Sequence, residues 1–184
     1  MGKIILDLCG GTGAWSKPYL EAGYDVQNIT LPDYDVRTYK VPENVYGILA
    51  GPPCTIFSKA RPMISRDRNF AGAMTIVEAC LKIIWAARIS GSLQFWALEN
   101  PATGYSRQFL GHPCFVFQPV EFGDPWTKMT ALWGYFHRPR KIHPVKKIRR
   151  IGSGYPQKVN QFKDSTRRSI TPANFAKAFF KANP

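Results

Sequence analysis

Closely spaced cysteines, long apolar runs and, toward the carboxyl end, acidic residues are all scarce in this sequence. Its four cysteines stand at positions 9, 54, 80 and 114, so no zinc-ligand spacing exists and we expect no metal site. No uninterrupted apolar run of about 18 residues occurs, and no charged start precedes an apolar segment, which argues against membrane spanning and secretion. Free thiols then suit a reducing cytoplasm, which is the location we expect.

The sequence does contain enough apolar residues to fill one core. It has 184 residues, of which 45% are hydrophobic and 14% aromatic. Chains of this length commonly form one compact unit before they divide into several. We therefore predict a single domain over residues 1–184.

Positive charge is concentrated in the last quarter of the chain. Residues 138–184 contain 13 Lys and Arg and one acid, Asp164, whereas residues 1–137 contain 12 basic and 11 acidic residues. A basic segment of this density attracts a phosphate backbone through Coulomb attraction and counterion release. The alternative interpretation is a solvated surface that keeps the protein soluble.

Strand and helix patterns alternate through the first two-thirds of the chain. Short apolar runs predict strands over residues 3–8, 25–31, 45–50, 95–98 and, more weakly, 131–136. Helices are predicted over residues 14–22, 71–90 and, from Thr171 and Pro172 as its start, to about 181. The helix over 71–90 is expected to bury a face made of Ile76, Val77, Cys80, Leu81, Ile84 and Trp85. The alternation favours an α/β fold with a mostly parallel sheet flanked by helices.

Three loops that directly follow predicted strands carry the unusual residues: 7–13, 51–58 and 99–101. Parallel strands bring their carboxyl ends to one edge of a sheet, so we expect the three loops to converge there. The first loop has three glycines in four positions, which let a bulky ligand approach the backbone. It lacks the Lys-Ser/Thr pair of a phosphate-binding loop. An ordinary strand-to-helix turn is the alternative interpretation.

The second loop contains the candidate nucleophile, Cys54. Pro52 and Pro53 fix the backbone immediately before the thiol and so restrict where the sulfur points. We expect the nearby Lys59 and Arg61 to lower the pKa of this thiol by favouring the thiolate. A cysteine that acts as a small hydrophobe is the alternative, and it is the expected role of Cys80 and Cys114.

The third loop presents Glu99 at the end of a strand of Phe, Trp, Ala and Leu. An apolar surrounding of this kind favours a partly protonated carboxyl group, which can donate a proton to a ring nitrogen. The alternative is a carboxylate that binds backbone amides at the end of the strand.

Together these motifs resemble, in order and spacing, the signature motifs of the cytosine C5 DNA methyltransferases. The resemblance rests on Asp7-Leu8-Cys9-Gly10-Gly11-Thr12-Gly13-Ala14-Trp15-Ser16, on Gly51-Pro52-Pro53-Cys54-Thr55-Ile56-Phe57-Ser58 and on Glu99-Asn100-Pro101. It extends more loosely to residues 122–128 and 168–172. The resemblance implies a Rossmann-like S-adenosylmethionine-dependent methyltransferase fold and transfer of a methyl group to C5 of cytosine.

The same resemblance implies roles for particular residues. Cys54 would attack C6 of the cytosine, Glu99 would steady the protonated N3, and Lys128 would stand where the family has an arginine. The cytosine would be flipped out of the DNA duplex to reach Cys54. S-adenosylmethionine would be held by Asp7, Leu8, Cys9, Gly10, Gly11, Gly13, Trp15, Pro52 and, at the adenine, Asp35.

Some parts of the family pattern are missing. The acid that usually binds the cofactor ribose is replaced by the sequence Asn28-Ile29-Thr30-Leu31, and the usual asparagine motif of the cofactor pocket is not visible. A loop-rich basic segment over about 137–168 stands in place of the target-recognition domain, so we expect low sequence specificity. The residues expected to contact nucleic acid are Ser58, Arg61, Arg138, Arg140, Lys141, Lys146, Lys147, Arg149, Arg150, Arg167 and Arg168.

Two other functions remain open from the sequence. The substrate could be cytosine in RNA or in a free nucleotide, which would explain the missing recognition domain. A catalytically silent nucleic-acid-binding relative is the second alternative. The small size is typical of bacteriophage enzymes, in which case the location would be the host cytoplasm.

Overall fold

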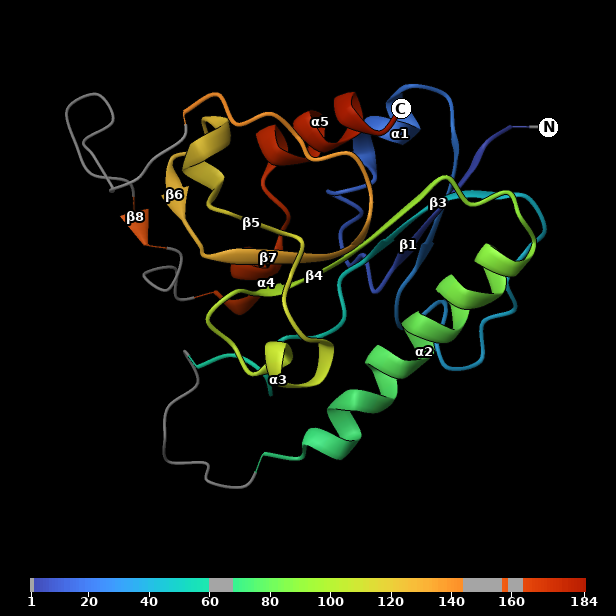
Figure 1. Cartoon of the computed structure of the whole chain (residues 1–184), viewed down its shortest axis with the longest axis horizontal. Helices are drawn as coiled ribbons and strands as arrows, with labels where there is room; N and C mark the ends of the chain where they lie inside the picture. Colours follow the sequence, from blue (N-terminus) through green and yellow to red (C-terminus); the bar gives the residue numbers. More distant parts are fainter. Residues whose placement is uncertain (1, 60–67, 144–156, 159–163) are drawn as a thin grey trace.

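A mixed six-stranded sheet forms the centre of the protein in a computed structural model, which describes residues 2–59, 68–143, 157–158 and 164–184 (Figure 1). The strand order is β2-β1-β3-β4-β7-β5. Their bounds are β1 Ile4–Leu8, β2 Asp25–Ile29, β3 Val45–Ala50, β4 Phe95–Pro101, β5 Phe115–Phe117 and β7 Thr130–Tyr135. The first four in this order are parallel, and β7 runs antiparallel to β4 and β5.

Helices flank the sheet on both faces. Helices α1 (Lys17–Glu21) and α5 (Ala173–Ala182) lie together on one side, and α2 (Phe70–Ile89) crosses the other (Figure 1). Shorter elements are α3 (Ser106–Leu110), α4 (Ser165–Ser169), the 3₁₀ helix η1 (Pro119–Phe122), and a parallel pair of β6 (Trp126–Thr127) and β8 (Gln157–Lys158). The described residues therefore confirm an α/β fold with a helix-flanked sheet.

Alternation along the strands divides the apolar side chains between two cores, because successive side chains of a strand point to opposite faces. Leu6 and Ile48 face α2 and pack with its Val77, Cys80 and Ile84. On the other face, residues such as Ile5 and Leu49 pack with a cluster of aromatic side chains that includes Phe175 and Phe179 of α5.

Aromatic side chains hold α5 onto the sheet. Phe175 stacks on Phe117 with ring centroids 4.0 Å apart, and Phe179 is fully buried among the same cluster. The Tyr19 hydroxyl donates a hydrogen bond of 2.8 Å to the Asn183 carbonyl, which fixes α1 against the end of α5. Helix α5 is thus part of the core.

The predicted strands all form, but several helical predictions needed correction. The first helix covers only Lys17–Glu21 instead of 14–22, because residues 10–16 form the turns of the glycine loop. Helix α5 begins at Ala173 with Pro172 at its N-cap, one residue later than predicted. Within residues 138–168, which were expected to be irregular, β8 and most of α4 form. The sequence pattern also did not indicate α3 or β5.

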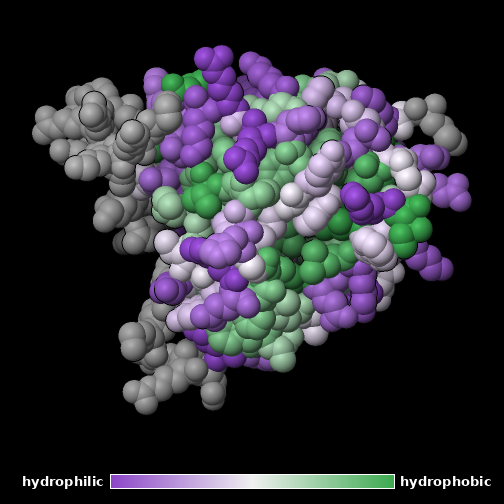
Figure 2. Space-filling model, in the orientation of Figure 1, coloured by the Kyte–Doolittle hydropathy of each residue, from purple (hydrophilic) through white to green (hydrophobic). Residues whose placement is uncertain are grey.

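Helix α2 matches its predicted range within one residue, but Trp85 was assigned to the wrong face. Its side chain is 63% exposed, and Ile89, one turn further on, is also exposed. Figure 2 shows apolar residues on the lower right of the molecular surface, over the region of α2 in Figure 1. By length and composition α2 would also qualify as a membrane span, which we did not expect, although core helices of soluble proteins pass the same test.

We predict that Phe179→Ala lowers the free energy of unfolding by about 3–5 kcal/mol, because it removes a fully buried ring and leaves a cavity between α5 and the sheet. Urea unfolding followed by circular dichroism measures the change. Lys177→Ala, at an exposed position of the same helix, is the control and should change stability little. Equal effects of the two substitutions would contradict the core role of α5.

Candidate functional site

The three loops do meet at one edge of the sheet. Strand β3 lies between β1 and β4, with Leu8 opposite Ala50 and Ala50 opposite Leu98. The Gly51 amide continues this ladder by donating 2.8 Å to the Leu8 carbonyl. The residues that follow β1 and β3 are therefore level with Glu99, which belongs to β4 itself and not to the loop after it.

The glycine loop is built over a buried carboxyl group. Asp7 is almost fully buried, and the Ser16 hydroxyl donates to its Oδ2 at 2.6 Å. A Cβ at Gly10 would stand 2.4 Å from the Asp7 Cγ, so only glycine fits there, and Gly11 and Gly13 both have positive φ. Burial raises the pKa of Asp7 to about 6, although the Ser16 hydrogen bond opposes the shift.

Asn28 contacts this loop and begins the segment, residues 28–31, where the resemblance would place an acid. It lies near the end of β2, opposite Asp7, and its Nδ2 donates 3.0 Å to the Gly11 carbonyl. Its Oδ1 is buried and has no hydrogen-bond partner. An unpaired buried acceptor is costly, and a ligand hydroxyl or amine placed against the loop would satisfy it.

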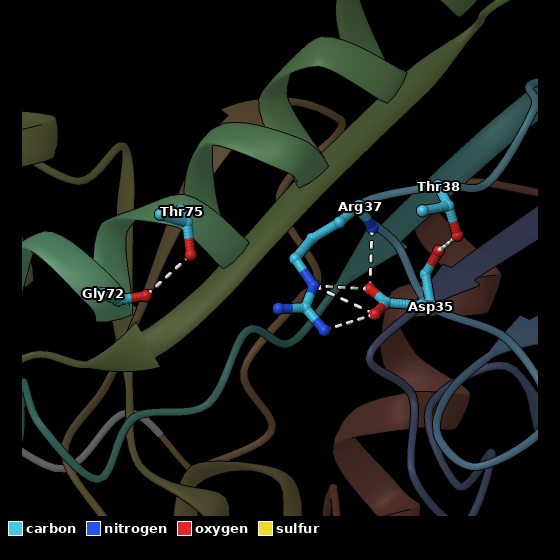
Figure 3. Close-up of polar contacts among 5 residues, drawn as sticks. All are labelled: Asp35, Arg37, Thr38, Gly72 and Thr75. Atoms are coloured by element: carbon cyan, nitrogen blue, oxygen red, sulfur yellow. Dashed lines mark hydrogen bonds and ion pairs between the residues drawn. The ribbon is translucent and has the colours of Figure 1, made fainter.

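Asp35 is close enough to the loop for its charge to act on Cys9, yet its carboxylate is already occupied. Arg37 donates to it from the backbone amide and from the guanidinium, including 2.9 Å from Nε to Oδ1 (Figure 3). These hydrogen bonds lower the pKa of Asp35 to about 2. A ligand amine that used Asp35 would have to share or displace Arg37.

A groove of about 470 Å³ opens next to this ion pair. Figure 3 shows Arg37 on one side and Gly72 and Thr75 of α2 across from it. The groove is lined by Val36, Arg37, Tyr39 and Val41 and, from α2, by Thr75, Glu78, Ala79, Lys82 and Ile83. Its lining combines apolar side chains with the charged groups of Arg37, Glu78 and Lys82.

The Cys54 loop is tied to β4 by a buried asparagine. Asn100 donates from Nδ2 to the Pro52 carbonyl at 3.2 Å, and its Oδ1 accepts 2.7 Å from the Ser106 hydroxyl. Both the nitrogen and the oxygen of the side-chain amide therefore make hydrogen bonds. Farther along the loop, the Ser58 amide donates 2.8 Å to the Cys54 carbonyl and closes a turn behind the thiol.

Glu99 and Lys128 form a partly buried ion pair in front of this turn. Lys128 Nζ lies 3.3 Å from Glu99 Oε1, and the two side chains are 15% and 20% exposed. The β6–β7 turn brings them together, because Thr130 pairs with Pro101 and the Met129 carbonyl accepts 2.9 Å from the Ala102 amide. Burial would lower the pKa of Lys128, but the charges of Glu99 and Cys54 outweigh it and raise the pKa.

The pKa of Cys54 is raised, which is opposite to the prediction. Burial is the main cause, and the negative charge of Glu99 adds to it, whereas Lys128 and Arg168 oppose the shift. Lys59, which was expected to lower this pKa, lies instead 5.5 Å from the Tyr105 ring, and Arg61 is outside the described residues. The positive charge near the thiol thus comes from a distant part of the chain.

Several residues predicted to bind the cofactor are buried behind the loops. Leu8 and Pro52 are buried, and their carbonyls already accept hydrogen bonds from Gly51 and Asn100. Trp15 is 3% exposed and packs against Phe175 and Phe179, with its Nε1 unpaired. It supports the loop from the core. The accessible members of the predicted set are Cys9, Gly10, Gly11, Gly13 and Asp35.

The predicted nucleic-acid contacts are only partly described. Arg138, Arg140 and Arg167 are exposed, and Ser58 and Arg168 are half-buried. Lys141 is held within the fold, because its Nζ lies 2.9 Å from Glu121 and donates 2.8 Å to the Val116 carbonyl. Lys146, Lys147, Arg149 and Arg150 lie outside the described residues.

Sequence reasoning missed three contributors to this site. Asn28 stands out in the sequence only as a non-acid, and Ser106 belongs to no pattern. Arg68, whose guanidinium donates to the Ile56 and Ser58 carbonyls of the Cys54 loop, does not differ in sequence from the arginines around it. The sequence did offer a signal for Asn28, since it is a polar residue within the strand predicted over residues 25–31.

Comparisons with known proteins identify no family for this chain: no protein-family model matches the sequence, and no curated protein matches it significantly. Functional inference therefore rests on the residues and their arrangement.

We predict that Asp7→Asn stabilises the protein above pH 6 and has little effect below pH 4. The folded pKa of Asp7, about 6, lies above its ordinary value of 3.8, so its stabilising contribution is complete below 3.8 and is lost as pH rises to about 6. The gain at pH 8 should be on the order of 2–3 kcal/mol. Denaturant unfolding at pH 4, 6 and 8 measures it, with exposed Asp25→Asn as control; a pH-independent effect would refute the assignment.

We also predict that two substitutions shift the titration of Cys54 in opposite directions. Glu99→Gln removes a charge that raises the thiol pKa, so the midpoint falls; Lys128→Met removes one that lowers it, so the midpoint rises. The rate of iodoacetamide alkylation of the Cys54 peptide, followed by mass spectrometry across pH, gives both midpoints. Exposed Glu43→Gln is the control. Shifts in the same direction would contradict the described geometry.

Proposed function

We propose that this protein transfers a methyl group from S-adenosylmethionine to C5 of cytosine in DNA through a covalent bond between Cys54 and C6. The observation that carries the proposal is the meeting of Cys54, Glu99 and Lys128 at the sheet edge that also bears the glycine loop. A nucleophile, a carboxylate and a cation, beside a loop suited to a bulky ligand, fit this reaction class.

The buried thiol and its carboxylate neighbour account for the proton movements of the first step. The Cys54 sulfur adds to C6, and the thiol proton passes by way of Glu99 to N3 of the ring. C5 then becomes nucleophilic in the manner of an enamine. Lys128 balances the charge of Glu99 and would place a single positive charge near the O2 carbonyl oxygen of the cytosine, without the fork of an arginine.

The second step restores the thiol. After C5 has accepted the methyl group, its own proton is lost to solvent, the C5–C6 double bond re-forms and the bond from sulfur to C6 breaks. The proton on N3 returns by way of Glu99 to the departing sulfur, which leaves 5-methylcytosine and a neutral thiol. The raised pKa of Cys54 favours a neutral thiol in the resting enzyme, so this proton has to be transferred when the sulfur attacks C6.

The residues around the glycine loop fit a cofactor of this kind. S-adenosylmethionine supplies an electrophilic methyl group when bound. The unpaired Asn28 Oδ1 would accept a hydrogen bond from its hydroxyl groups, and the backbone from Cys9 to Gly13 would lie along it. Asp35 and the groove beside it would take the adenine end, at the cost of disturbing Arg37. We assign the α/β sheet on this basis to the Rossmann-like methyltransferase folds.

Duplex DNA with a flipped cytosine is the substrate we favour. Arg138, Arg140 and Arg167 are exposed cations in a sequence segment that is almost without acids, and Arg168 acts on the Cys54 thiol from the same segment. Phosphate contacts of this kind give affinity without sequence information, so we expect low specificity.

Radiolabelled S-adenosylmethionine tests the proposal when it is supplied with duplex DNA, single-stranded DNA, RNA or dCMP. Label should enter duplex DNA and appear as 5-methylcytosine after digestion. Label in RNA or dCMP alone would mean that RNA or the free nucleotide, and not duplex DNA, is the substrate. The absence of both methyl transfer and cofactor binding would refute the proposed function.

We predict that Glu99→Gln slows the single-turnover rate by about 10²–10⁴-fold with little change in cofactor affinity, because the amide cannot carry the proton to N3. Equal losses of rate and of cofactor affinity would instead indicate a structural or cofactor-binding role for Glu99.

We predict that Cys54→Ser abolishes transfer, since a hydroxyl is far less nucleophilic than a thiolate, while exposed Cys114→Ser retains it. Duplex DNA with 5-fluorocytosine should trap a covalent adduct on Cys54 in the wild type. An adduct that still forms in Cys54→Ser would show that another residue is the nucleophile.

A further inference from the structure

Arg68 binds the rear of the Cys54 loop. Its Nη1 donates to two carbonyls of that loop, those of Ile56 at 2.5 Å and Ser58 at 2.8 Å. The residue is half-buried and stands just before α2, outside the loop that it binds. Hydrogen bonds from a charged donor are stronger than those between neutral groups, so this contact is a substantial restraint.

The guanidinium of Arg68 also contacts Tyr105, the residue that immediately precedes α3. The guanidinium carbon lies 5.1 Å from the centre of the Tyr105 ring, within the range of a cation–π contact. The Tyr105 amide donates 2.8 Å to the Phe57 carbonyl, and a Cβ at Gly104 would come within 2.8 Å of that same oxygen. Glycine at 104 therefore allows a close approach that brings Tyr105 under Arg68.

Phe57 makes this part of the loop a fixed point. Its ring is almost fully buried and contacts Phe70 of α2 and Phe109 of α3. Arg68 thus binds the carbonyls on both sides of an anchored residue. Since the Asn100 side chain binds the Pro52 carbonyl, the Cys54 loop is held both before and behind the thiol.

We propose that Arg68 is a positioning residue that holds the Cys54 loop in register with Glu99. The assignment rests on the proposed function, because it presumes that Cys54 reacts. Arg68 does not approach the reacting atoms; it fixes the turn in which the Ser58 amide binds the Cys54 carbonyl. Small displacements of a reacting group are costly to rate, so loss of this restraint should act on the chemical step more than on binding.

Hydrogen–deuterium exchange tests the restraint without any need for activity. Arg68→Met keeps an apolar stem but removes every donor, so the amides of residues 54–58 should exchange about tenfold faster than in the wild type. Peptides from β1 and β4 should exchange as before. Arg107→Met is the matched control: Arg107 is an exposed arginine of α3 that contacts His112, and its loss should leave residues 54–58 unchanged.

Kinetics then test the positioning role. For Arg68→Met, we expect the single-turnover rate to fall about tenfold while the affinities for cofactor and duplex DNA stay within about twofold of wild type. Arg68→Lys keeps a charged donor and should recover part of the rate. An equal loss of rate and affinity, or no recovery with lysine, would indicate a general structural role and overturn the assignment.

The two readouts separate failure of this inference from failure of the proposed function. Unchanged exchange at residues 54–58 in Arg68→Met, or an equal increase in Arg107→Met, would refute the restraint whether or not the protein methylates DNA. Faster exchange in a wild-type protein that methylates nothing would refute the function and leave the restraint standing.

Discussion

The position of β3 between two parallel neighbours is the constraint on which the candidate site depends. Hydrogen bonding to β1 and β4 sets Leu8, Ala50 and Leu98 level, so the chain leaves β1 and β3 beside the end of β4. Buried polar contacts then extend this alignment beyond the strands: Gly51 binds the Leu8 carbonyl, and Asn100 binds that of Pro52. Without that register, the Cys54 loop would not lie beside Glu99 of β4.

Within the site, burial and charge act against one another, and the balance differs at each group. Burial raises the thiol pKa of Cys54 despite two nearby cations, whereas the charge of Glu99 keeps Lys128 protonated despite its burial. Glu99 and Lys128 both act on the Cys54 thiol through their charges, and Glu99 and Cys54 act on Lys128 in the same way. A substitution at one of these groups therefore alters the charge that its neighbours experience.

The local sequence pattern was sufficient to predict the strands at whose ends the site lies. It was insufficient to predict which residues from distant parts of the chain approach Cys54 and Glu99. Apolar runs located β1, β3 and β4, and the prolines before Cys54 marked a fixed thiol. Lys128 could be named only through the family resemblance, since its approach to Glu99 depends on the antiparallel pairing of β4 with β7. The pKa of Cys54 was mispredicted for the same reason, because nearness in sequence suggested Lys59 and burial was not visible.

At Asp35 the important contact is local in sequence, because Arg37 binds its carboxylate and lowers its pKa. The resemblance marks Asp35 as an acceptor for an adenine amine, but Arg37, two residues on, fills both carboxylate oxygens. The pair is partly exposed, and exposed ion pairs contribute little to stability, so its displacement would be a small cost for a ligand that also filled the groove. Arg37 itself lines the groove, so a ligand that displaced it from Asp35 would still meet the guanidinium there.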